Sequence, residues 1–136
     1  MAHQYLGSCL CGAIQYEIHG DFESFYLCHC QRCRKGTGSA HAANLFSTTA
    51  KLSWLKGEAQ VTRYHLPETM HQRSFCSVCG TAVPTLQLNG KLLVVPAGSL
   101  DSSVSLVPNA HIFTGNRADW DKHLETVPEF EQYPEE

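Results

Sequence analysis

The chain has 136 residues, of which 43% are apolar and 17% are charged, and its formal net charge is −3. These values are typical of one globular domain and exclude intrinsic disorder, and the acidic balance argues against a dedicated nucleic-acid-binding protein, which carries a basic excess. No apolar run approaches the roughly 18 residues of a membrane span, and the N-terminal stretch MAHQYLGSC lacks the regions of a signal peptide, so we expect one cytoplasmic domain over residues 1–136 without a membrane partner.

Short segments rich in β-forming residues alternate with frequent turn signals, which predicts a mainly β fold with antiparallel strands. In the segment AIQYEI, the residues Ile14, Tyr16 and Ile18 alternate with polar residues, as in a half-buried strand. Further candidate strands cover residues 40–47, 51–55 and 60–66. From residue 81 to residue 95 the pattern is strand, turn and strand, and the Asn89-Gly90 pair between them is the strongest short signal for a hairpin.

The rest of the chain gives weaker signals. No segment shows a sustained helical period, and we expect at most one or two helical turns around residues 117–124. The acidic tail at residues 129–136, EFEQYPEE, is expected to be solvated.

Seven cysteines dominate the chemistry of the chain: Cys9, Cys11, Cys28, Cys30, Cys33, Cys76 and Cys79. Disulfide bonds are one explanation, but the odd number, the tight spacing and a cytoplasmic location disfavour them. The cysteines fall into the clusters CLC, CHCQRC and CSVC, and thiolates at such spacings are common zinc ligands. Metal binding is therefore the favoured interpretation.

Glycine follows the last cysteine of two clusters, as Cys11-Gly12 and Cys79-Gly80. A two-residue spacing between thiols lets backbone N–H groups point at the first sulfur, and a following glycine can adopt positive φ and turn the chain away. The CSVC stretch with Gly80 is therefore typical of a zinc knuckle, and Cys11-Gly12 has the same glycine after its last cysteine.

Two partitions of the seven thiols are possible. In the first, one tetrahedral site contains Cys9, Cys11, Cys76 and Cys79, and a second site with an open position contains Cys28, Cys30 and Cys33. In the second, a zinc ribbon contains Cys30, Cys33, Cys76 and Cys79. The first partition uses every cysteine, whereas the second leaves three without a role. Four-ligand zinc sites are structural, whereas three protein ligands and an exchangeable position are the catalytic pattern.

A histidine could instead complete the three-cysteine site and make it structural. His41, His71 and His111 could reach it from elsewhere in the chain. His29 lies between two of the cysteines, so in an extended segment its side chain would point to the opposite face.

Arg32, Arg34 and Lys35 flank the three-cysteine cluster. Nearby cations favour the thiolate form of cysteine and would attract an anionic substrate. A solvated basic turn is the alternative.

Five stretches of the chain follow one another in a recognisable order: GSCLCGAIQYEI, CHCQRCRKGTGSAHAANLF, FCSVCGTAVP, AGSLD and HIFTGNRADW. Together they resemble the glutathione-dependent formaldehyde-activating enzyme family, which includes centromere protein V in animals, from Gly7 to near Tyr133. The resemblance implies a compact, mainly β, Mss4-like fold. It also implies a structural zinc on Cys9, Cys11, Cys76 and Cys79 and a catalytic zinc on Cys28, Cys30 and Cys33.

The resemblance further implies a carbon–sulfur lyase that interconverts S-hydroxymethylglutathione with glutathione and formaldehyde. A substrate thiol would be the fourth ligand of the three-cysteine zinc, and glutathione is the candidate thiol. Arg34 or Lys35 could hold a substrate carboxylate, and His29, His41 or His111 could move the proton. The alternatives are a non-catalytic two-zinc scaffold that binds a protein or nucleic-acid partner, and a redox or metal sensor.

Overall fold

The computed structural model describes residues 3–134. Its strands are β1 (Gln4–Ser8), β2 (Gln15–His19), β3 (Ser24–Cys28), β4 (Ala42–Ser47), β5 (Lys51–Lys56), β6 (Val61–His65), β7 (Gln72–Cys76), β8 (Ala82–Val83), β9 (Thr85–Gln87), β10 (Leu92–Pro96) and β11 (Ala110–Ile112). A short helix, α1 (Gln31–Thr37), connects β3 to β4. Single 3₁₀ turns cover Glu58–Gln60, Ala97–Ser99, Thr114–Asn116 and Leu124–Thr126.

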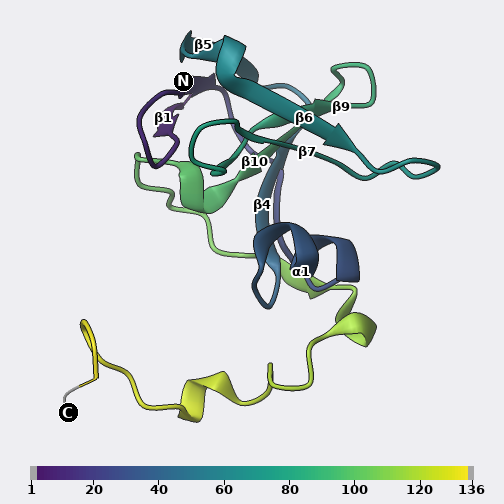
Figure 1. Ribbon diagram of the computed structural model, residues 1–136, viewed down its shortest axis with the longest axis vertical. Helices are drawn as coiled ribbons and strands as arrows, with labels where there is room; N and C mark the ends of the chain where they lie inside the picture. The colour runs from purple at the N-terminus through teal and green to yellow at the C-terminus, as the bar shows by residue number, and fades with distance from the viewer. Residues whose placement is uncertain (1–2, 135–136) are drawn as a thin grey trace.

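The strands form three sheets, with the orders β1-β2-β5, β11-β3-β4-β10-β9 and β6-β7-β8. Neighbouring strands are antiparallel, except that β11 pairs in parallel with β3. Figure 1 shows α1 beside one end of β4, and the segment after β11 running away from the sheets along that side of the molecule. The prediction of a mainly β fold with antiparallel strands is confirmed.

The predicted strands are present. Ile14, Tyr16 and Ile18 are completely buried in and just before β2, as their alternation predicts. The candidates at residues 40–47, 51–55 and 60–66 correspond to β4, β5 and β6. The predicted hairpin is formed by β9 and β10, and Leu88, Asn89 and Gly90 adopt positive φ in the turn between them.

Two groups of buried side chains make up the core. The larger one joins the first two sheets and contains Tyr5, Tyr16, Ile18, Phe22, Leu45, Leu93 and Val95. The smaller one contains Cys9, Ile14, Cys76 and Val83. Two of the predicted metal ligands are therefore part of the hydrophobic core.

The helical expectations are only partly correct. Residues 117–123 are not helical, and the 3₁₀ turns lie on either side of them. The sequence also failed to indicate α1, which buries none of its residues completely and so has no apolar period to detect. Residues 129–134 of the acidic tail are exposed as expected, and residues 135–136 lie outside the described part.

Within residues 3–134, no helix combines the length and the apolar character that crossing a membrane requires.

Candidate metal centres

The first candidate centre, the four-cysteine cluster, consists of Cys9, Cys11, Cys76 and Cys79. Its sulfurs lie within 4.8 Å of one another, and the Sγ of Cys11 is 3.7 Å from that of Cys9 and 3.9 Å from that of Cys76. Because sulfurs at tetrahedral positions about a zinc ion are just under 4 Å apart, the two measured separations fit such an ion.

The two halves of this cluster share three features, although the first has one residue between its cysteines and the second has two. The backbone N–H of Ile14 donates to the Cys9 sulfur at 3.2 Å, and the N–H of Val78 donates to the Cys76 sulfur at 3.4 Å. Gly12 and Gly80 have φ of 80° and 79°, and their N–H groups donate to the carbonyls of Cys9 and Cys76. Both turns are therefore knuckles whose N–H groups stabilise negative sulfur.

At the second knuckle, further hydrogen bonds stabilise a negative charge on the sulfur of Cys79. Hydrogen bonds from the hydroxyl and the backbone of Thr81 lower the pKa of the Cys79 thiol to about 5. The Thr81 hydroxyl oxygen lies 3.2 Å from the Cys79 sulfur. These hydrogen bonds therefore favour the thiolate form of Cys79, which is the form that binds metal.

The second candidate centre, the three-cysteine cluster, consists of Cys28, Cys30 and Cys33, whose sulfurs also lie within 4.8 Å of one another. Cys28 ends β3, Cys30 is the N-cap of α1, and Cys33 lies in the first turn of the helix. The N–H of Cys33 donates to the Cys30 sulfur at 3.4 Å. The short helix thus brings together thiols that the sequence spaces unevenly.

The three-cysteine cluster favours a cation. Burial raises the pKa of the Cys33 thiol, and the sulfurs of Cys28 and Cys30 raise it further. Three thiolates at this separation repel one another unless a positive ion lies between them. Sulfur donors at these distances suit zinc, which binds thiolates well, so the residues of both clusters fit that metal.

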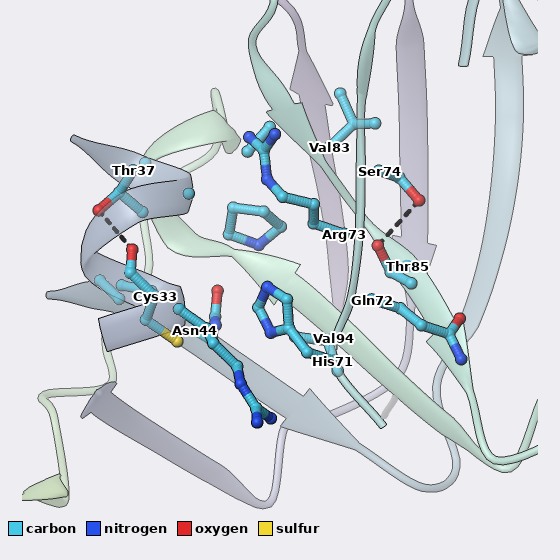
Figure 2. Close-up of a pocket in the computed structure, with 17 residues that line it drawn as sticks. Cys33, Thr37, Asn44, His71, Gln72, Arg73, Ser74, Val83, Thr85 and Val94 are labelled. Carbon is cyan, nitrogen blue, oxygen red and sulfur yellow. Dashed lines mark hydrogen bonds between the residues drawn. The ribbon is translucent and has the colours of Figure 1, made fainter. Parts of the chain in front are cut away.

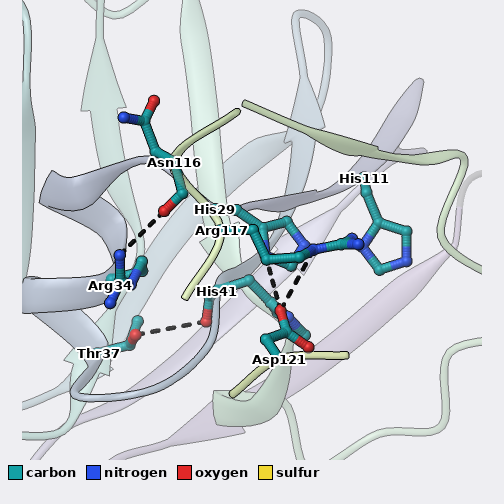
Figure 3. Close-up of polar contacts among 8 residues, drawn as sticks. All are labelled: His29, Arg34, Thr37, His41, His111, Asn116, Arg117 and Asp121. Carbon is teal, nitrogen blue, oxygen red and sulfur yellow. Dashed lines mark hydrogen bonds and ion pairs between the residues drawn. The ribbon is translucent and has the colours of Figure 1, made fainter. Parts of the chain in front are cut away.

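No histidine or carboxylate atom joins the three sulfurs as a ligand in the described part of the chain. His29 is 1% exposed and is not among the ligand atoms grouped with the three sulfurs. Its Nε2 is hydrogen-bonded to Nδ1 of His111 at 2.8 Å, and its Nδ1 lies 3.1 Å from an Asp121 carboxylate oxygen (Figure 3). The expectation that His29 faces the opposite side agrees with this arrangement.

Asp121 is a residue of this region that the sequence did not indicate. It is 8% exposed and also lies 3.5 Å from Nε of Arg117. Burial, followed by the charge of Arg117, lowers the pKa of His29, which is therefore a neutral imidazole at neutral pH. The segment after β11 thus contacts His29, which lies between Cys28 and Cys30 in the sequence, through Asp121 (Figure 3).

A cleft of about 220 Å³ adjoins Cys33 (Figure 2). Its polar and charged lining residues are Arg32, Cys33, Thr37, Asn44, His71, Gln72, Arg73, Ser74 and Thr85, and the others are apolar residues or glycine. Figure 2 shows His71 and Arg73 directed toward the helix that carries Cys33. Among residues 3–134, no acidic side chain lines the cleft.

The basic residues flanking the cysteines point in different directions. Arg34, which the sequence suggested as a carboxylate-binding residue, donates to the carbonyl of Asn116 at 2.9 Å and does not line the cleft (Figure 3). Lys35, the other suggested residue, lies on neighbouring hollows. Arg32 lines the cleft together with Arg73, which no sequence signal connected to the cysteines.

Comparisons with known proteins agree with this architecture. The family model described as "Glutathione-dependent formaldehyde-activating enzyme" matches residues 4–116. An uncharacterized lyase of Schizosaccharomyces pombe is 35% identical over 88 residues, which are 65% of this chain and 61% of the relative. The crystal structure of a Rhodobacter sphaeroides protein matches with a TM-score of 0.57 at 21% identity, over 78% of this chain and 98% of that chain, and it supports the fold alone.

Proposed function

The chain belongs to the glutathione-dependent formaldehyde-activating enzyme family, and we propose from this that it is a zinc-dependent carbon–sulfur lyase acting on a thiol–aldehyde adduct such as S-hydroxymethylglutathione. The observation that carries the proposal is the three-cysteine cluster, which lacks a fourth protein ligand among residues 3–134 and adjoins a cleft at Cys33. The similar protein of Schizosaccharomyces pombe is named a lyase, which supports the same reaction class. A single domain over residues 1–136 and a cytoplasmic location stay predictions from the sequence.

The two clusters have separate roles in this proposal. Cys9, Cys11, Cys76 and Cys79 would hold a structural zinc, because four thiolates complete its tetrahedral shell. Cys28, Cys30 and Cys33 would hold a catalytic zinc. When bound there, zinc supplies one exchangeable position, at which a substrate thiol is held as a thiolate.

The reaction breaks the bond between sulfur and the hydroxymethyl carbon, and the electron pair of that bond stays on sulfur. The hydroxyl group loses its proton as the carbonyl forms, and that proton ends on the released thiol. His71 lines the cleft, and burial, followed by the charges of Arg32 and Arg73, lowers its pKa. A neutral His71 can accept this proton, so we propose it for the transfer in place of His29, His41 and His111, which do not line the cleft.

The first prediction concerns metal content. The seven thiols divide into groups of four and three, so purified protein should bind two zinc ions per chain. The ion on three thiolates should leave first under a chelator, because it has fewer protein ligands. Metal analysis during stepwise chelation measures the zinc content and the order in which the ions leave. A content of one ion after reconstitution with zinc would contradict the division of the thiols into groups of four and three.

The second prediction tests the exchangeable position. In protein loaded with cobalt, a small thiol should strengthen the sulfur-to-metal charge-transfer band by about one thiolate's contribution, because one Co–S bond is added. Cys33→Ser should abolish this response.

Val78→Ser is the matched control. Val78 lies between Cys76 and Cys79 in the second knuckle, is exposed and is not a candidate metal ligand in either cluster. It should leave the response unchanged. A spectrum that millimolar thiol does not alter would instead favour a non-catalytic two-zinc scaffold.

A further inference from the structure

Two arginines from distant parts of the chain meet at the cleft beside Cys33. Arg32 lies in α1 and Arg73 in β7, and both line the cleft. They also line an adjoining hollow of about 440 Å³, so they stand where the two spaces meet. A Cβ added to Gly36 of α1 would lie 3.4 Å from Nε of Arg73, which places the side chain of Arg73 directly against the helix.

The charges of these two arginines are not matched by carboxylates. None of the ion pairs within the described residues involves Arg32 or Arg73. In the part of the chain that the structure describes, no aspartate or glutamate lines the cleft or the adjoining hollow. Because the whole chain has a net charge of −3, this local positive charge is a property of the cleft and not of the protein in general.

Arg73 is also held in position. Its guanidinium carbon lies 5.0 Å from the centre of the Phe75 ring, within the range of a cation–π contact. The guanidinium has five N–H donors, and contact with one ring leaves others available to an acceptor. Arg73 is half-buried, whereas Arg32 is exposed, so one arginine lies deeper and the other at the rim.

We propose that Arg32 and Arg73 form a carboxylate-binding subsite beside the three-cysteine centre, which selects a carboxylate-bearing thiol over a neutral one. The choice of substrate class rests on the proposed function, whereas the subsite itself does not. Guanidinium groups bind carboxylates through paired, charge-assisted hydrogen bonds. The apolar wall of the cleft, which includes Ala42, Val83 and Val94, suits the short carbon chain between carboxylate and thiol.

His71 provides an internal reporter of this subsite. It lines both spaces with Arg32 and Arg73, and Lys35 and Tyr64 line the adjoining hollow. Burial and the two arginines lower the pKa of His71. A bound carboxylate would offset the arginine charges, so it should raise the pKa of His71 toward its ordinary value.

The third prediction compares two thiols of similar size, 3-mercaptopropionate and 2-mercaptoethanol, in the cobalt titration. The native protein should bind the carboxylate-bearing thiol at least tenfold more tightly, and added salt should reduce the preference. Arg32→Gln and Arg73→Gln should each remove most of it. Arg34→Gln is the matched control, because it removes the same charge from the same helix outside the cleft, and it should keep the preference.

A second measurement uses glutarate, which has no thiol, and follows the His71 ring signals by NMR in the zinc-loaded protein and in Cys33→Ser. Glutarate should raise the pKa of His71 in both proteins, and Arg73→Gln should abolish the rise. If glutarate raises the pKa of His71 while no thiol alters the cobalt spectrum, the subsite is correct and the proposed function is wrong. If thiols bind cobalt without a preference and glutarate has no effect, the function stands and the subsite is wrong. Equal affinity for inorganic phosphate and glutarate would overturn the carboxylate assignment.

Discussion

Cys76→Ser should leave the chain largely unfolded even when zinc is supplied. Cys76 is 1% exposed and belongs to the smaller core group, so the change removes a proposed metal ligand and buries a hydroxyl in its place. Structural zinc contributes about 10–16 kcal/mol in small zinc domains, whereas the whole free energy of unfolding of a domain is about 5–15 kcal/mol. Far-ultraviolet circular dichroism and the soluble yield measure the outcome.

Cys33→Ser is the informative comparison for that variant. Cys33 comes from the three-cysteine cluster and lies in a helix that buries none of its residues completely, so its replacement should cost one zinc ion and leave the fold intact. If Cys33→Ser unfolds as severely as Cys76→Ser, both centres are structural and the enzyme hypothesis falls.

Gly57→Ala should be the most damaging change that touches no proposed metal ligand. A Cβ at Gly57 would lie 1.9 Å from the carbonyl oxygen of Ala13, and φ of +77° adds the strain of a left-handed backbone. Ala13 belongs to the first knuckle, next to Ile14, whose N–H donates to the Cys9 sulfur. Because backbone must move to relieve the clash, we expect a loss above about 3 kcal/mol in the free energy of unfolding.

Gly90→Ala is the control that has the strain of a left-handed backbone without a steric clash. Gly90 has a similar φ of +83°, but nothing lies within 4 Å of its added Cβ. This variant should lose only about 1–2 kcal/mol. Urea unfolding of both variants with zinc bound gives the comparison, and equal losses would show that the contact with Ala13 relaxes easily. Gly57→Ala should also release zinc from the four-cysteine cluster at a lower chelator concentration.

Much of the site could be predicted from the sequence because thiol chemistry is local. The CxxC spacing and the glycines after Cys11 and Cys79 indicate turns that expose N–H groups to sulfur, and the structure contains both turns. The division of the seven cysteines into a group of four and a group of three was favoured because it uses all of them, and the sulfurs do lie in those two groups. Alternation likewise revealed β2, because one face of that strand is completely buried.

The remaining features depend on contacts that no local pattern records. Every residue of β3 is half-buried, so no alternation marks that strand. Arg73 reaches the cleft only because β7 packs near α1, far from it in sequence. Asp121 approaches His29 only because β11 pairs in parallel with β3, through a register of Ala110 with Tyr26 that is set by tertiary packing. Long-range partners of this kind are invisible to periodicity.

The separation of Cys11 from Cys76 also orders events during synthesis. The ribosome adds about 5–20 residues per second, so the first knuckle emerges several seconds before the second and spends that interval as an incomplete pair of thiols. The three thiols from Cys28 to Cys33 emerge almost together and can capture an ion at once. If both clusters bind zinc as proposed, the nascent chain acquires the ion of the three-cysteine cluster first, and the four-cysteine cluster is complete only when more than half of the polypeptide has been made.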